Sequence, residues 1–293
     1  MTGASSGPKF LMKLHVVHRT VYQYAQPVSD SFNEVRLKPL SADGQTCDAF
    51  LLKVLPTARL SHFLDFYFNY VQTFEILEPH SVLTVESTAD VTTSSSRMAE
   101  DADSALLDAL AECARQEFCY DFLQSSKFVL VSPEIWRLAV DACQGQSQVW
   151  KCAVAICRFI HTEFKYEQFS TDVHTGSSEV LELRRGVCQD FAHVMIGMCR
   201  AWKIPARYVS GYLYNGPADH LTGAQASHAW CEVYLPGLGW RALDPTNNQP
   251  ADERYIRLAV GRDYADVAPI KGYYKGTKDK RMQVEVSVEL LQR

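Results

Sequence analysis

Three residues of this sequence have the types that form a nucleophile, a base and an orienting acid. Cys188 follows Gly186 and begins a run whose apolar residues recur every three or four positions, the spacing of one buried helix face. A thiol at the first turn of a helix lies near unsatisfied N–H groups and the positive end of the helix dipole, which favour the thiolate. We therefore expect Cys188 to act as a nucleophile.

The expected partners of this thiol lie on two consecutive strands. His228 begins the alternating run 228–234, and Asp244 follows the run 239–243, immediately before Pro245. An imidazole that accepts the thiol proton and a carboxylate that fixes the imidazole tautomer complete this type of site. The alternative, that Cys188 is one more core thiol among nine cysteines, does not account for these partners.

The hairpin that joins these strands sets a condition on the triad. If Leu235 paired directly with Trp240, Asp244 would lie opposite Cys231, and its side chain would point away from His228. An offset of one residue at the turn 236–239 would bring both side chains to one face of the sheet. We predict such an offset, because a regular hairpin without it would remove Asp244 from the site.

Other polar and aromatic residues near these motifs have two interpretations each. His193 shares a helix face with Asp190, and we expect a structural hydrogen bond there rather than a second base. Tyr166 and Trp230 either line the pocket or belong to the core. The backbone N–H of Cys188 is expected to help form the oxyanion hole, together with a second donor that the sequence does not identify.

The elements that must position these residues fall into two parts. Alternating runs with turn signals predict strands near 12–22, 33–38, 48–55, 63–72 and 80–88. Helical spacing follows near 106–118, 133–142, 149–164 and 180–185, before the Cys188 helix. Strands at 206–213, 226–234, 239–243, 255–260 and 283–290 are expected to form one further sheet. We predict an α+β fold with a flexible extension at 1–11, a β-rich N-terminal domain at 12–100 and a catalytic domain at 101–293.

The composition limits the function classes. The chain has 293 residues, is 47% hydrophobic and 22% charged, and carries a net charge of -5, which argues against nucleic-acid binding. It has no apolar run long enough to span a membrane, and its cysteines match no zinc pattern and include no C-x-x-C pair. We expect a cytoplasmic protein that needs no cofactor or metal, and its oligomeric state stays open.

Several motifs resemble the bacterial transglutaminase-like family, whose members are often described as cysteine proteases. They cover nearly the whole chain after Phe10 and stand in the family's order: His18–Tyr24, Glu34–Pro39, Gly186–His193, Ile204–Tyr212, Ser227–Trp230, Gly239–Asn247 and Gly261–Pro269. The resemblance implies a papain-like or transglutaminase-like core, in which a helix carrying Cys188 packs on an antiparallel sheet. It assigns Cys188 as the nucleophile, His228 as the base and Asp244 as the orienting acid.

The sequence favours acyl transfer through a thioester on Cys188, with a peptide or amide as the substrate. Water is the expected acceptor, which would make the protein a cysteine peptidase or amidase. One alternative is a protein-glutamine transglutaminase that uses an amine acceptor. It would not be switched by calcium, because no calcium-loop pattern is present. The other alternative is a binding scaffold without catalysis, which gives no reason to retain all three residues.

Overall fold

The computed structural model describes residues 10–95, 102, 104–168, 176–216, 221–223 and 227–292. Residues 1–9 of the expected flexible extension lie outside the described residues, and Phe10 and Leu11 already belong to the first strand. Residues 96–101 and 103, where we expect the boundary between the two domains, also lie outside the described residues. The domain limits therefore stay predictions.

The N-terminal region is built around the long strand β1 (Phe10–Val35). Within the described residues, it belongs to a seven-stranded antiparallel sheet with β2 (Gln45–Leu55), β3 (Ser61–Leu64), β4 (Tyr70–Ile76) and β5 (His80–Ser95). The register shifts between Gln23 and Val28. Up to that point β1 pairs mainly with β5, and beyond residue 31 it pairs with β4. Alternate residues of β1, such as Leu14 and Val16, are buried, as the sequence alternation predicts.

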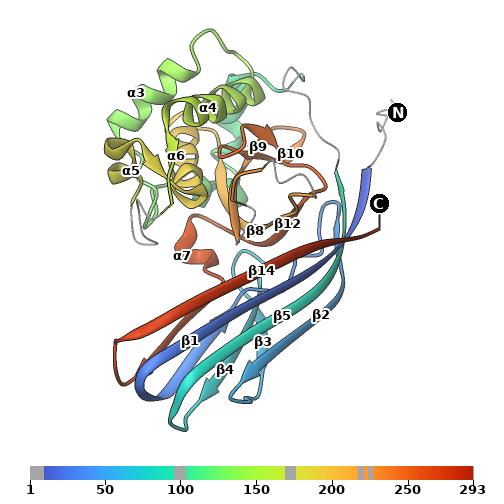
Figure 1. Ribbon diagram of the computed structural model, residues 1–293. Coiled ribbons are helices and arrows are strands. Elements are labelled where there is room, and N and C mark those ends of the chain that lie inside the picture. Colours follow the sequence, from blue (N-terminus) through green and yellow to red (C-terminus); the bar gives the residue numbers. More distant parts are fainter. Residues whose placement is uncertain are drawn as a thin grey trace.

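The last two strands of the chain return to this N-terminal sheet. Strand β13 (Ile270–Lys275) pairs with the second half of β1, and β14 (Lys280–Gln292) pairs with the first half, so that β1 and β14 lie side by side (Figure 1). The prediction that 283–290 completes the core sheet is therefore wrong. Alternation identifies a strand but not its partner, and Val286 and Val288 pack against the N-terminal core.

The core is a five-stranded antiparallel sheet in the order β11-β10-β9-β8-β12. Its strands are β8 (Ala206–Leu213), β9 (His228–Leu235), β10 (Gly239–Asp244), β11 (Gln249–Pro250) and β12 (Tyr255–Gly261). Helix α6 (Cys188–Ala201) packs on this sheet and is surrounded by α3 (Pro133–Ala142), α4 (Val149–Glu163) and α5 (Ser177–Leu183) (Figure 1). This part of the fold also contains three shorter elements: β6 (Lys165–Tyr166), β7 (Arg185–Gly186) and α7 (Tyr264–Val267). The predicted α+β class and the papain-like core are confirmed.

Helix α6 is buried on all sides and not only along its apolar stripe. Every residue from Asp190 to Ala201 is buried. Near its C-terminal end, Arg200 is fully buried and donates hydrogen bonds to the backbone carbonyls of Gln124, Ala206 and Arg262. These bonds satisfy the buried guanidinium and hold the end of the helix in place, so that its first residue has a fixed position.

Two predicted elements are broken in the structure. The helix expected at 106–118 consists of short pieces: η1 (Leu107–Ala109), α1 (Leu110–Cys113), α2 (Glu117–Tyr120) and η2 (Asp121–Leu123). Its outermost apolar residues, Leu106 and Phe118, are exposed, so no continuous buried face supports one helix. The strand expected at 63–72 is the hairpin β3–β4, because the Asp65 carboxylate accepts the N–H groups of Tyr67 and Asn69 and forms a turn.

The two parts of the fold share a buried interface. Tyr212, Ile256 and Leu258 of the core sheet belong to the same apolar cluster as the N-terminal strands. At this interface His18 lies within 2.9 Å of the Tyr212 hydroxyl through Nδ1 and within 3.0 Å of the Thr20 hydroxyl through Nε2. Burial lowers the pKa of His18 from 6.5 to about 4.

This lowered pKa predicts a pH-dependent loss of stability. The folded protein resists protonation of His18 and the unfolded chain does not, so the contribution is complete above pH 6.5 and is lost as the pH falls towards 4. The full difference between the two pKa values corresponds to about 3 kcal/mol in the free energy of unfolding. We expect the free energies of unfolding of wild type and His18→Asn, measured in urea, to converge between pH 7 and pH 4. A difference between His18→Asn and wild type that stays constant over this pH range would contradict the prediction.

Candidate active site

Cys188 is the first residue of α6, as the sequence predicts. The chain enters the helix in extended conformation at Val187, whose N–H donates to Asp190 Oδ2 at 2.8 Å and thereby caps the helix. Gly186 makes room for this cap, because a Cβ at that position would lie 2.6 Å from Asp190 Oδ2. The segment 186–190 therefore places a half-buried thiol at the positive end of a buried helix.

The hairpin β9–β10 has the predicted offset. Gly239 pairs with Leu235 and Leu243 pairs with Cys231, which brings Asp244 opposite Trp230 and onto the face of the sheet that carries His228. His228 Nε2 lies 2.8 Å from Asp244 Oδ2, and both side chains are fully buried. The structure thus brings these two predicted site residues into direct contact.

The Asp244 carboxylate is held from several directions. Oδ2 accepts hydrogen bonds from Asn247 Nδ2 at 2.7 Å and from the Tyr255 hydroxyl at 2.8 Å, in addition to its contact with His228. Oδ1 accepts the backbone N–H of Thr246 at 2.8 Å. Burial acts to raise the pKa of Asp244, but the charge of His228 and the hydrogen bonds from His228, Asn247 and Tyr255 hold it below its usual value.

The His228 imidazole interacts with both Asp244 and Cys188. Asp244 engages Nε2, and Cys188 is among the groups that affect the pKa of the ring. Burial acts to lower the pKa of His228, but Asp244 and Cys188 outweigh it and raise the pKa to about 10. A raised pKa favours the protonated imidazolium, which is the partner that a thiolate at the start of α6 would need.

Other residues named from the sequence take distinct places. Trp230 is fully buried and stacks on the His228 ring, with ring centroids 6.0 Å apart. Tyr166 packs edge-on against Phe191 of α6, and burial together with the charge of Cys188 raises its pKa to about 12. His193 is fully buried, stacks on Phe128 and accepts the backbone N–H of Tyr264, which is a structural role rather than that of a base.

Two residues of the site were not found by sequence reasoning. Tyr255 and Asn247 both donate to Asp244 Oδ2. Asn247 follows Asp244 closely in the chain and lies within a motif quoted for the family resemblance, so a polar residue after the acid was an available signal. Tyr255 begins a separate strand, and no local pattern connects it to the site.

Comparisons with known proteins agree with this geometry. Residues 137–245 match the transglutaminase-like superfamily, and residues 14–92 match the bacterial transglutaminase-like N-terminal region. An uncharacterized protein of Mycobacterium leprae is 34% identical over 284 residues, which cover 96% of this chain and 100% of that protein. The chain therefore belongs to the bacterial transglutaminase-like family.

Two further proteins are similar to this chain. A protein-glutamine gamma-glutamyltransferase of Pseudomonas aeruginosa is 33% identical over 151 residues, which cover 47% of this chain and 22% of that enzyme. A crystal structure from Cytophaga hutchinsonii, named a "Putative Cysteine Protease", superposes with a TM-score of 0.79 at 23% identity, covering 98% of this chain and 94% of the other. The latter shows that the whole fold, N-terminal region included, is shared. Among the described residues, no helix has the length and apolar character needed to cross a membrane.

A Cys188 thiolate paired with the His228 imidazolium would be alkylated selectively at low pH. Cys47 serves as an internal control, because it is the other thiol that is not fully buried, and burial raises its pKa. We expect iodoacetamide at pH 6 to modify Cys188 at least about tenfold faster than Cys47, measured by mass spectrometry of the two peptides. His228→Ala and Asp244→Asn should remove this advantage. Equal rates at the two thiols in the wild type would contradict an activated Cys188.

Gly223 provides a test of imidazole placement. Its φ is +87°, and a Cβ there would lie 2.8 Å from His228 Nδ1 and 3.7 Å from the Tyr166 hydroxyl. Since Asp244 holds the ring from the other side, Gly223→Ala should displace the imidazole and slow Cys188 alkylation by about tenfold or more. Gly237→Ala is the matched control, because Gly237 has a similar φ of +79° and no atom within 4 Å of the added Cβ. Equal rates in both variants would show that the contact has no effect on reactivity.

Proposed function

We propose that this protein is a cysteine-dependent acyl-transfer enzyme that hydrolyses peptide or amide bonds through a thioester on Cys188. The observation that carries the proposal is the contact of His228 Nε2 with Asp244, which leaves Nδ1 for the thiol at the start of α6. Family membership supports the same class of chemistry. A peptide or amide substrate is part of the proposal. So is a cytoplasmic location, because all nine cysteines are free thiols and the cytoplasm keeps thiols reduced.

The proposed reaction has two steps, each with a proton transfer. The Cys188 thiolate attacks the carbonyl carbon, and the backbone N–H of Cys188 stabilises the oxyanion. The His228 imidazolium then donates its proton to the leaving amine as the C–N bond breaks, which leaves a thioester. In the second step the neutral imidazole takes a proton from water, and the hydroxide attacks the thioester. The C–S bond then breaks, the carboxylic acid leaves, and the Cys188 thiolate and the His228 imidazolium are restored.

An amine acceptor is the alternative that a specific observation favours. The Pseudomonas aeruginosa relative, which is named a protein-glutamine gamma-glutamyltransferase, is 33% identical over the segment that it shares with this chain. The first step would be the same, and a lysine amine rather than water would attack the thioester. A binding module without catalysis is the remaining alternative, and it would have no use for an activated thiol.

The identity of the acyl acceptor, water or an amine, is tested by identifying the reaction products. We expect purified protein, incubated with a peptide library prepared from a proteome digest, to generate new carboxyl termini or to convert side-chain amides to acids, detected by mass spectrometry in ¹⁸O-labelled water. No incorporation of a fluorescent primary amine is expected, and Cys188→Ala should abolish the reaction. Amine incorporation that depends on Cys188 would instead establish the transferase alternative. A Cys188 thiol that is inert to iodoacetamide, with no product of either kind, would favour the binding module.

A further inference from the structure

Tyr255 contacts both members of the acid–base pair. At the start of β12, its hydroxyl donates to Asp244 Oδ2 at 2.8 Å and accepts a hydrogen bond from Gln249 Nε2 at 2.9 Å. Its ring meets Trp230 edge-on with centroids 5.3 Å apart, and Trp230 in turn stacks on His228. Tyr255 is buried, so this hydrogen bond is shielded from water.

The position of this donor matters because Oδ2 is also the oxygen that holds His228. A phenol that donates to a carboxylate disperses its negative charge and fixes its orientation. Without this donor, Oδ2 would keep only the hydrogen bond from Asn247 beside its contact with His228. The carboxylate would be held less firmly, and the imidazole that it orients would be less well placed. A misplaced imidazole is a weaker partner for the Cys188 thiolate.

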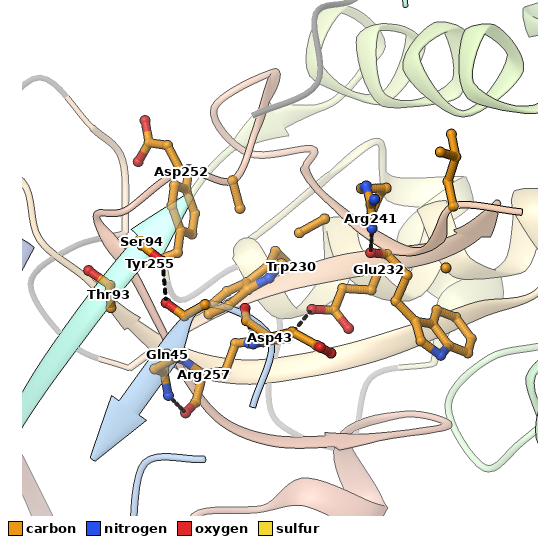
Figure 2. A pocket seen from close by; sticks show the side chains of 16 residues that line it. Asp43, Gln45, Thr93, Ser94, Trp230, Glu232, Arg241, Asp252, Tyr255 and Arg257 are labelled. Carbon is orange, nitrogen blue, oxygen red and sulfur yellow. Dashed lines mark hydrogen bonds and ion pairs between the residues drawn. The ribbon is translucent and has the colours of Figure 1, made fainter. Parts of the chain in front are cut away.

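The N-terminal region holds the backbone on both sides of Tyr255. Gln45 of β2 donates through Nε2 to the carbonyl of Arg257 at 2.9 Å and accepts the Arg257 N–H at 2.8 Å. The Thr93 hydroxyl of β5 donates to the carbonyl of Glu253 at 2.5 Å. Glu253 and Arg257 are each two residues away from Tyr255. Figure 2 shows Gln45, Thr93, Tyr255 and Arg257 around one cavity of about 480 Å³, formed where the two parts of the fold meet.

We propose that Tyr255 is a positioning residue for the His228–Asp244 pair and that the N-terminal region places it through Gln45 and Thr93. This inference rests on the proposed function, since it assigns a role in the activation of Cys188. Among the described residues, the titratable groups around His228 are Cys188 from α6, Asp244 from β10, Tyr255 from β12 and Tyr166 from β6, whose hydroxyl lies near Gly223 as the imidazole does. The N-terminal region thereby contributes to the reactivity of a thiol that belongs to the other part of the fold.

The test is the pH profile of Cys188 alkylation by iodoacetamide, recorded between pH 4 and pH 9. In Tyr255→Phe the ring still packs on Trp230 but the hydroxyl is absent. We expect the midpoint of the profile to move to higher pH by about 0.5 unit or more, while the maximal rate at high pH stays within about twofold. Gln249→Leu removes only the donor to the Tyr255 hydroxyl and should shift the midpoint in the same direction by a smaller amount. This variant replaces Tyr255→Phe as the test if Tyr255→Phe does not fold.

The role of the N-terminal region is tested with two neighbouring threonines. Thr93→Val removes the hydrogen bond to Glu253 and should move the midpoint in the direction of Tyr255→Phe. Thr92→Val is the matched control, because the Thr92 hydroxyl bonds to Asp48 on the outside of the sheet. Identical profiles for the two variants would overturn the part played by the N-terminal region.

The outcomes separate this inference from the proposed function. A wild-type profile that is unaffected by His228→Ala would contradict the proposed function itself. A wild-type profile that depends on His228, together with unshifted midpoints in Tyr255→Phe and Gln249→Leu, would overturn only the positioning role of Tyr255.

Discussion

The contact between the buried Asp244 carboxylate and the His228 imidazole is the constraint on which the rest of the site depends. Burying a charged carboxylate away from water costs free energy unless hydrogen-bond donors surround it. Here the donors come from three places. They are His228 on the neighbouring strand β9, Thr246 and Asn247 in the turn after Asp244, and Tyr255 on β12. The acid therefore joins three separate segments of the core sheet, and none of them can shift without leaving part of the charge unpaired.

Two other features of the fold hold the elements around this contact in place, namely the burial of α6 and the packing of the N-terminal sheet against the core sheet. The thiol needs a helix start in a fixed place, and the burial of α6, with Arg200 bound to three carbonyls, supplies it. The imidazole and the acid need a sheet whose strands do not slide. The N-terminal sheet helps to fix that sheet through the buried interface at Tyr212 and the hydrogen bonds to β12, while β13 and β14 tie the end of the chain back to β1.

The sequence was informative where the signal is local. Cys188 begins a long periodic run, and the positions of His228 and Asp244 on adjacent strands follow from alternation, so that even the hairpin offset could be deduced from the requirement that both face one side. Signals that depend on distant partners were not readable. The partner of β14 is the first strand of the chain, and the Tyr255 hydroxyl meets Asp244 only when separate strands assemble into the sheet. The lead-in at 106–118 is broken because its outermost apolar residues are not covered. The catalytic roles themselves stay a proposal.

The same physical terms predict that one thiol among nine differs from the others in reactivity. Burial raises the pKa of Cys119 to about 12, and the pKa of Cys199 lies well above its usual value because its S–H donates to Cys231 and the side chain is fully buried. Cys199 belongs to the same helix as Cys188, but it lies near the far end, away from the positive helix terminus and the imidazole. We therefore expect reactivity to require a helix start, a partly accessible surface and a neighbouring imidazole together, and a cysteine that lacks any of these to behave as a small apolar residue.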